Sequence, residues 1–125
     1  EMTLHTRADA TLADAVIYST HPAMLQHAGL LGNFNALAAR CRLQRWGGDC
    51  YGFALLAQGC IDLMIDSMLM PYDIVPLIPI IERAGGKVTD LFGQAPLQGG
   101  TVIAAANSRL HAEALEIMTR PAAPG

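Results

Sequence analysis

The chain has 125 residues, of which 52% are hydrophobic and only 15% are charged, and its net charge at pH 7 is −3. Because domains of this size usually contain about 25% charged residues, the chain is either embedded in a membrane or separated from a domain or subunit that covers part of its surface. Four acidic residues between positions 62 and 82 interrupt the most apolar region. They leave no run near the roughly 18 apolar residues of a spanning helix, which favours a covered domain with no membrane partner.

The first half of the chain alternates between strand and helix patterns. Ala13–Thr20 is rich in β-forming residues and ends at Ser-Thr-His-Pro, which predicts a strand followed by a turn. Apolar residues from Phe34 to Cys41 recur at helical spacing, and 42–46 has the composition of a short strand. After the Gly47-Gly48 pair, the segment 49–59 is apolar almost all round, so we expect a helix buried on more than one side.

The second half continues this alternation. Acidic and apolar residues alternate over 60–66, which predicts a strand, and Ile74–Ala84 predicts a helix that two glycines end and that Pro79 bends. Strands over 87–90 and 101–106 follow, and then a helix over 107–118 that Asn107 or Ser108 caps. These elements predict a single α/β domain over residues 1–125, with a mixed β-sheet flanked by helices and a loose tail over 119–125.

The segment Gly47-Gly48-Asp49 is the first candidate for ligand binding. Two glycines between a strand and a buried helix let a ligand approach the backbone, where N–H groups point outward from the helix start. The segment lacks the further glycines of a dinucleotide fingerprint or a phosphate loop. A tight turn with Asp49 as the helix N-cap explains the same residues, so both interpretations stay open on this feature.

Three aspartates are the second candidate. Asp62 and Asp66 lie four residues apart in the predicted strand and would share a face, while Asp73 lies at the start of the next helix. An aspartate at the end of a strand and another at the start of the next helix can converge at the C-terminal edge of a sheet, where α/β proteins bind ligands, and carboxylates gathered there suit magnesium. The alternative is that these aspartates are solvated acids and that Asp73 only caps its helix.

Other residues exclude several functions. The four histidines have no zinc-binding spacing and no adjacent nucleophile, so we expect them to be surface or helix residues. Ser19-Thr20 could bind a substrate oxygen, although such a pair is common before a proline turn. Seven arginines and one lysine are scattered, which argues against a nucleic-acid partner. Three cysteines without CxxC spacing, and no signal-peptide pattern, indicate a cytoplasmic protein with reduced thiols.

The order of these motifs resembles one enzyme family. The run GGDCYGFALLAQGCIDLMIDSMLMPYDIVPLIPIIERAGGKVTD resembles the C-terminal half of the inositol monophosphatase family of magnesium-dependent phosphatases, and TVIAAANSRLH resembles its closing strand and helix. The separation of Tyr72-Asp73 from Glu-x-Ala-Gly-Gly is the most specific feature. GGDCYG and PYDIVPLIPIIERAGG look like the histidinol-phosphatase branch, because inositol phosphatases tend to have small residues at positions 49 and 50 and a Trp before the aspartate.

The resemblance implies a role for each candidate residue. Asp73 matches the aspartate that helps to bind the catalytic metal ions, beside the leaving oxygen of the substrate, and Asp66 matches an acidic position that contacts the substrate alcohol. Gly47, Gly48 and Asp49 match the segment that lines the substrate pocket. A carboxylate at Asp49 can pair with the ammonium group of an amino-alcohol phosphate, which inositol lacks. Two or more Mg²⁺ ions are expected in the complete enzyme.

The family's other metal ligands, a glutamate pair and an Asp-Pro-x-Asp-Gly-Thr segment, belong to an N-terminal half that nothing in this sequence resembles. The resemblance therefore implies the C-terminal half of a layered αβαβα phosphatase, inactive alone, that hydrolyses histidinol phosphate in histidine synthesis. Its expected partners are the missing half, a small phosphorylated metabolite and further copies of the enzyme. The alternatives are a phosphatase for inositol phosphate or another sugar phosphate, and a non-catalytic domain or oligomerisation module.

Overall fold

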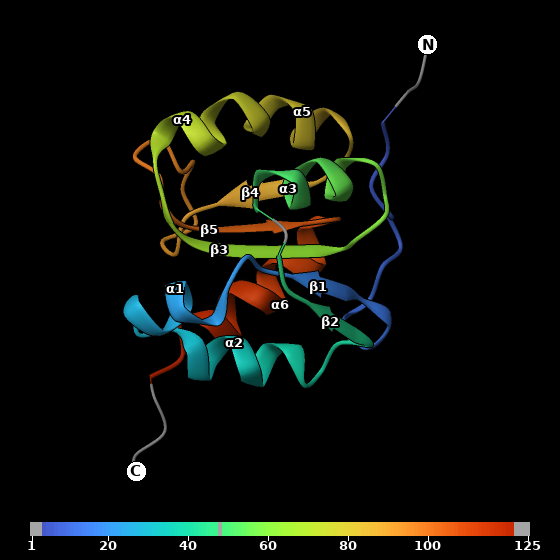
Figure 1. Ribbon diagram of the computed structural model, residues 1–125. Helices are drawn as coiled ribbons and strands as arrows, with labels where there is room; N and C mark the ends of the chain where they lie inside the picture. Colours follow the sequence, from blue (N-terminus) through green and yellow to red (C-terminus); the bar gives the residue numbers. More distant parts are fainter. Residues whose placement is uncertain (1–3, 48, 122–125) are drawn as a thin grey trace.

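The computed structural model describes residues 4–47 and 49–121, and in these residues five strands form one mixed sheet in the order β2-β1-β3-β5-β4 (Figure 1). β1 (Val16–Tyr18) lies parallel to β2 (Leu43–Arg45) and to β3 (Leu63–Leu69). β5 (Gly100–Ala105) runs antiparallel to β3 and to β4 (Lys87–Thr89). The predicted α/β class with a mixed sheet is confirmed.

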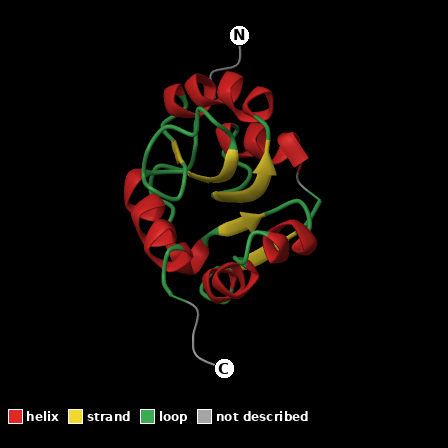
Figure 2. Ribbon diagram, turned by 90° about the vertical axis from the view of Figure 1, so that its left-hand side faces the viewer, coloured by secondary structure: helices red, strands yellow, loops and turns green. Residues whose placement is uncertain are grey.

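Helices cover both faces of the sheet (Figures 1 and 2). One face carries α3 (Asp49–Ala57), α4 (Pro71–Ile74) and α5 (Ile78–Arg83), and the 3₁₀ turn η2 (Val75–Leu77) separates the last two. The other face carries α1 (Pro22–His27), α2 (Leu31–Ala38) and α6 (Ser108–Met118), and a second 3₁₀ turn, η1 (Leu12–Asp14), precedes β1. No helix in the described part of the chain is long and apolar enough to cross a membrane.

The neighbouring strands β3 and β5 contribute side chains to two separate hydrophobic cores, one on each face of the sheet. Leu63 and Ile65 of β3 and Ile103 of β5 belong to the core that α2 and α6 cover. Met64 and Val102, their neighbours along the same strands, belong to the core that α3 and α5 cover. Because successive side chains of a strand point to opposite faces, β3 and β5 are buried on both sides and form the rigid centre of the domain.

Three elements differ from the sequence predictions. The strand predicted over 60–66 begins at Leu63 and ends at Leu69, and the helix predicted over 74–84 begins at Pro71 and is divided by η2. That division contains Pro76, which removes a backbone donor, and it precedes the predicted bend at Pro79. The sequence predicts only a turn where α1 forms, although a proline at the first helical position is favourable.

The last helix is fixed at both of its ends. The side-chain oxygen of Asn107 accepts a hydrogen bond from the N–H of Leu110 at 2.8 Å, so Asn107 rather than Ser108 is the N-cap. Beyond Met118, the Asn33 side chain of α2 donates to the carbonyl oxygen of Arg120 at 2.9 Å. The boundaries of the domain and the loose tail over 119–125 stay predictions, and 122–125 lie outside the described residues.

A β-bulge interrupts β3 near its end. Asp66 pairs with Val102 and Leu69 pairs with Gly100, so β3 contains one extra residue between these two pairs. Within the bulge Met68 has a φ of 61°, in the left-handed region, and its side chain is exposed. Gly99 lies against the Leu69 carbonyl oxygen, where a Cβ would have no room. The bulge therefore depends on a glycine in the chain that passes beside it.

Candidate active site

A pocket of about 410 Å³ opens where β1 and β3 end, beside the starts of α3 and α4. Its lining comes from the segment after β1 and from α1, α3, β3 and α4, and consists of Thr20, Met24, Tyr51, Asp66, Met68, Leu69 and Asp73. The carboxyl ends of parallel strands are the usual ligand-binding edge of an α/β sheet. The pocket brings together Asp66 and Asp73, two of the residues that the sequence singles out.

Asp66 is held by donors from the segment that follows β1. The residue is only 1% exposed, and its Oδ2 accepts a hydrogen bond from Thr20 Oγ1 at 2.7 Å. Its Oδ1 accepts two longer bonds, from Ser19 Oγ and from the Thr20 N–H, both at 3.4 Å. Hydrogen bonds of this kind offset the free energy that burying a carboxylate costs, and they fix the direction in which the carboxylate points.

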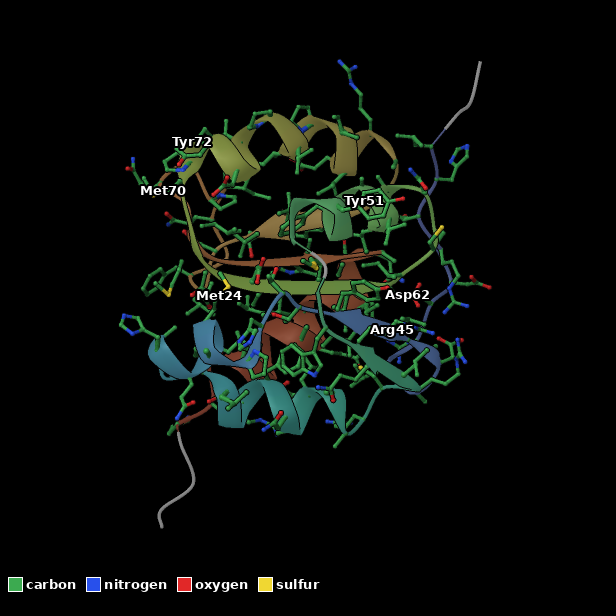
Figure 3. The ribbon with its side chains drawn as sticks, viewed as in Figure 1. Met24, Arg45, Tyr51, Asp62, Met70 and Tyr72 are labelled. Carbon is green, nitrogen blue, oxygen red and sulfur yellow. The ribbon has the colours of Figure 1, made fainter. Side chains whose placement is uncertain are left out.

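Asp73 is the third residue of α4 and caps this helix. Its Oδ2 accepts a hydrogen bond from the N–H of Met70 at 2.9 Å. Asp73 is also half-buried and lines the pocket, so the capping bond does not exclude a second role for the carboxylate. Its neighbours Met70 and Tyr72 are exposed near the start of α4 (Figure 3).

Gly47, the first residue of the predicted Gly47–Asp49 segment, is hydrogen-bonded to a residue of the pocket. Gly47 has a φ of 90°, and its N–H donates to the carbonyl oxygen of Thr20 at 2.9 Å. A Cβ on Gly47 would meet no atom within 4 Å, so the left-handed backbone rather than crowding favours glycine here. Asp49 is the first residue of α3, but its side chain and Gly48 lie outside the described residues. The substrate-binding roles of this segment stay predictions.

Asp62 lies away from the pocket and is only 2% exposed, so the alternative that it is a solvated acid is wrong. Its buried carboxylate accepts hydrogen bonds from Arg7 Nε at 2.8 Å and from the Val16 N–H at 2.9 Å. Val16 begins β1 whereas Thr20 follows its end, so the carboxylates of Asp62 and Asp66 lie at opposite ends of this strand. Figure 3 shows Asp62 at the right-hand end of the sheet and Met70 at the left-hand end.

His111 of α6 is a buried histidine outside the pocket. Its Nε2 lies 2.7 Å from Thr89 Oγ1, and the residue is 2% exposed. Because the Thr89 hydroxyl donates to the carbonyl oxygen of Asp90, His111 Nε2 is the donor in this pair. Burial, and to a smaller extent the positive charge of Lys87, lowers the pKa of His111 to about 4. His111 is therefore an uncharged structural residue at neutral pH.

The described residues contain no group of three or more histidine, cysteine, aspartate or glutamate side chains that could hold a metal ion. The pocket offers instead the carboxylates of Asp66 and Asp73. Magnesium commonly binds through only one or two protein carboxylates, together with water and phosphate oxygens. Asp73, less buried than Asp66, has the chemistry to supply one ligand of such a site.

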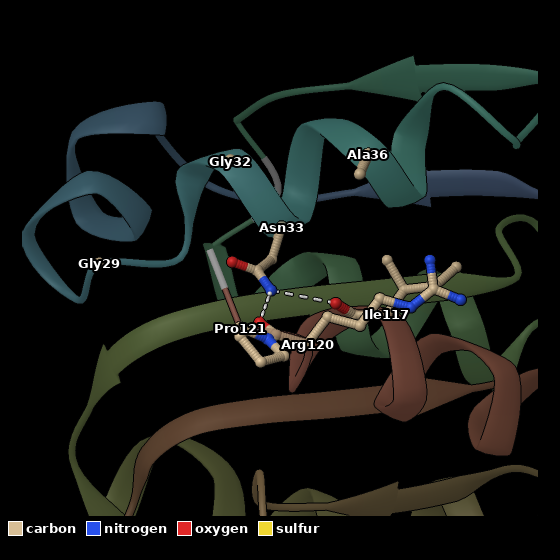
Figure 4. Close-up of a pocket in the computed structure, with 7 residues that line it drawn as sticks. All are labelled: Gly29, Gly32, Asn33, Ala36, Ile117, Arg120 and Pro121. Atoms are coloured by element: carbon tan, nitrogen blue, oxygen red, sulfur yellow. Dashed lines mark hydrogen bonds between the residues drawn. The ribbon is translucent and has the colours of Figure 1, made fainter. Parts of the chain in front are cut away.

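A second hollow, of about 430 Å³, lies between α2 and the end of α6 (Figure 4). Asn33 spans it, because its Nδ2 donates to the carbonyl oxygens of Ile117 and Arg120 at 3.0 Å and 2.9 Å. None of the described residues that line this hollow is acidic or a histidine. We therefore place the candidate active site in the pocket that contains Asp66 and Asp73.

Met24, Tyr51 and Met68 also line the pocket, but the sequence motifs indicate no site role for Met24 or Tyr51 and indicate Met68 only as a core or interface residue. Tyr51 follows the Gly-Gly-Asp-Cys motif directly, and this position is the one signal that could have placed it there. Met68 reaches the pocket through the bulge, for which the sequence has no signature. Met24 lies on a helix that the sequence predicts only as a turn.

A mixed sheet with carboxylates at the ends of its parallel strands defines an α/β ligand-binding domain, and comparison with known proteins identifies its family. The model of the inositol monophosphatase family matches residues 3–120, so the chain belongs to this family. The resemblance that the sequence motifs indicate is confirmed.

Two curated relatives illustrate the match. The chloroplastic bifunctional phosphatase IMPL2 of Arabidopsis thaliana is 35% identical over 122 residues, which cover 90% of this chain and 35% of that protein. A histidinol-phosphatase of Chlorobaculum parvum is 37% identical over 68 residues, which cover 54% of this chain and 26% of that protein. The chain thus spans about a third of the length of the curated relatives it matches.

Solved structures have the same fold. An inositol monophosphatase from Zymomonas mobilis is 36% identical with a TM-score of 0.84, covering 94% of this chain and 47% of that chain. An IMPase/NADP phosphatase complexed with Mg²⁺ and phosphate has a TM-score of 0.78 at 23% identity, covering 97% and 45% of the two chains, which shows the fold alone. Each solved chain is about twice as long as the part that matches.

Proposed function

We propose that this chain is the C-terminal half of a magnesium-dependent phosphomonoesterase that hydrolyses histidinol phosphate to histidinol and phosphate. The observation that carries the proposal is the meeting of Asp66 and Asp73 in one pocket at the ends of β1 and β3. Family membership supports phosphatase chemistry. Three curated relatives with 31–37% identity are named histidinol-phosphatases, which supports this substrate over others.

Asp73 is the residue we assign to the metal and to the leaving-group side of the reaction. A bound magnesium ion would supply a water of lowered pKa and stabilise negative charge on the oxygens of the phosphate. The capping bond from Met70 holds the Asp73 carboxylate at the start of α4, which keeps it oriented without a contribution from the ligand. The remaining ligands would come from the part of the protein that this chain does not span.

The pocket walls suit the alcohol part of the substrate. We assign Asp66 to accept hydrogen bonds from the substrate alcohol, and Asp49 to pair with its ammonium group. Met24, Tyr51 and Met68 supply apolar and aromatic surface in the pocket that Asp66 lines, against which a carbon chain and a flat ring can pack. A cationic, partly apolar leaving group fits this combination better than a neutral polyol does.

Inositol phosphate is the second candidate substrate, because the similar Zymomonas mobilis structure is described as an inositol monophosphatase. The two substrates differ in the ammonium group, so Asp49→Ala separates them. In the enzyme that contains this chain together with the other half of the fold, we expect this change to raise the KM for histidinol phosphate roughly ten-fold. The KM for inositol 1-phosphate should change little.

Initial rates on both substrates provide the test, with Glu116→Ala as the matched surface control, since Glu116 makes only an exposed ion pair with Arg120. Equal KM changes on the two substrates would overturn the assignment of Asp49, and faster turnover of inositol 1-phosphate by the unaltered enzyme would overturn the choice of substrate. The non-catalytic alternative predicts no turnover of either compound by the complete protein.

The chain by itself should bind magnesium weakly and have negligible activity, because two carboxylates do not complete a two-metal site. Four large side chains in and near the pocket are 51–75% exposed to solvent: Tyr51, Met68, Met70 and Tyr72. We assign this apolar surface to contact with the missing half of the enzyme. A cytoplasmic location and assembly of the complete enzyme into a homo-oligomer belong to the same proposal.

A further inference from the structure

Thr20 connects the two parts of the candidate substrate pocket. Its hydroxyl donates to Asp66 Oδ2 at 2.7 Å, a shorter bond than the two at 3.4 Å that Oδ1 accepts. Its carbonyl oxygen accepts the N–H of Gly47 at 2.9 Å. One residue therefore joins the carboxylate on β3 to the glycine segment that leads into α3.

The backbone around Thr20 is fixed independently of any ligand. The preceding residue, Ser19, is fully buried, and its N–H donates to the carbonyl oxygen of Arg45 at the end of β2. The Thr20 N–H and the Ser19 hydroxyl both face Asp66 Oδ1 at 3.4 Å. The Thr20 side chain thus leaves a rigid strand end, and its hydroxyl is aimed at the carboxylate before substrate arrives.

The direction of this hydrogen bond has a chemical consequence. A hydroxyl has a single proton, and Thr20 uses it to donate a hydrogen bond to Asp66. The bond orients the Asp66 carboxylate, which can only accept hydrogen bonds when it is ionised. An acceptor of negative charge favours a leaving group rich in donors, and an ammonium group brings three donors and a positive charge.

We propose that Thr20 is a positioning residue that sets the orientation of Asp66 and thereby the preference of the pocket for amine-bearing alcohol phosphates. This role rests on the proposed function, because it assumes that Asp66 contacts the substrate alcohol. It differs from the role of Asp49, since Thr20 acts through another residue and makes its hydrogen bond to Asp66 without any ligand.

Thr20→Val tests the role because valine keeps the shape of threonine and removes the hydroxyl. In the complete enzyme, we expect the KM for histidinol phosphate to rise roughly ten-fold, the change that the loss of one hydrogen bond to a charged group produces. The change in kcat should be smaller, and the KM for inositol 1-phosphate should rise less. Thr20→Ser restores the hydroxyl and should return the KM to within about two-fold of the starting value.

Thr101→Val is the matched control, because the Thr101 hydroxyl lies 3.0 Å from Ser67 Oγ, next to Asp66 in sequence but outside the pocket lining. It should leave the ratio of the two KM values unchanged. Circular dichroism shows whether Thr20→Val folds, and Thr20→Ala replaces it if it does not. An active enzyme whose KM ratio is the same with Val, Ala, Ser and Thr at position 20 overturns the positioning role alone. An unaltered enzyme that releases no phosphate overturns the proposed function and this role together.

Discussion

Asp62 and Asp66 lie four residues apart in the sequence, yet their surroundings give them different tasks. Asp62 pairs with the Arg7 guanidinium and the Val16 N–H, so its charge is neutralised inside the fold. Asp66 receives hydrogen bonds from the neutral donors of Ser19 and Thr20 and borders a pocket. The alternation of acidic and apolar residues in a sequence does not show which acidic residue forms an ion pair with an arginine. Only the fold distinguishes the structural carboxylate from the candidate functional one.

His111 should make the stability of the domain depend on pH. Burial lowers its pKa to about 4 from an ordinary value of 6.5, so the unfolded chain takes up a proton that the folded chain does not. The contribution of neutral His111 is fully present above pH 6.5, and it is lost as the pH falls from 6.5 toward 4. Over that window, this residue alone should reduce the free energy of unfolding by up to about 1.4 kcal/mol per pH unit.

Urea unfolding between pH 7 and pH 4.5 measures this dependence. His111→Gln keeps an N–H that can donate to Thr89 but has no titrating ring, so its free energy of unfolding should fall less over the same range. Parallel curves for the two proteins would show that other groups cause the acid sensitivity.

Among the elements, the bulge in β3 decides the shape of the pocket. It places Met68 at the pocket and turns the chain toward Pro71, where the helix that carries Asp73 begins. The sequence predicts β2, β4, β5, α3 and α6 from composition and periodicity, because their patterns are local. It misplaces β3 by three residues at its start and overlooks the bulge, because both depend on pairing with β5, more than thirty residues away.

Gly99→Ala should disrupt the bulge. Gly99 and Gly29 share a φ of 76°, but a Cβ on Gly99 would collide with the Leu69 backbone whereas a Cβ on Gly29 would meet nothing within 4 Å. Gly29→Ala should therefore cost only about 1 kcal/mol, the penalty of a left-handed backbone. Gly99→Ala should cost at least about 2 kcal/mol more, because the added carbon overpacks the site.

Urea midpoints of the two variants give this comparison directly, since the backbone term cancels between them. Equal losses of stability would mean that the chain beside the bulge yields easily. The interpretation that a rigid bulge decides the shape of the pocket would then be wrong.

In the molecule as a whole, a mixed sheet with helices on both faces carries the candidate pocket at one end of its parallel strands. Its two buried cores lie on either side of β3 and β5, while the candidate pocket has two carboxylates and a rim of exposed methionine and tyrosine. Composition already indicates surplus apolar surface, and ordered motifs already indicate Asp66 and Asp73. The contact between Thr20 and Asp66 could not be predicted, because it joins residues 46 positions apart.

Phosphate release from histidinol phosphate by the complete enzyme tests most directly whether Asp73 binds a catalytic magnesium ion. The release is measured with and without Mg²⁺ for the unaltered protein and for Asp73→Asn. Asp9→Asn, at an exposed aspartate outside the pocket, is the control. We expect turnover that depends on magnesium. Asp73→Asn should reduce it at least about a hundred-fold, because a lost metal ligand removes several kcal/mol of transition-state stabilisation. Unchanged turnover in Asp73→Asn would contradict this role of Asp73.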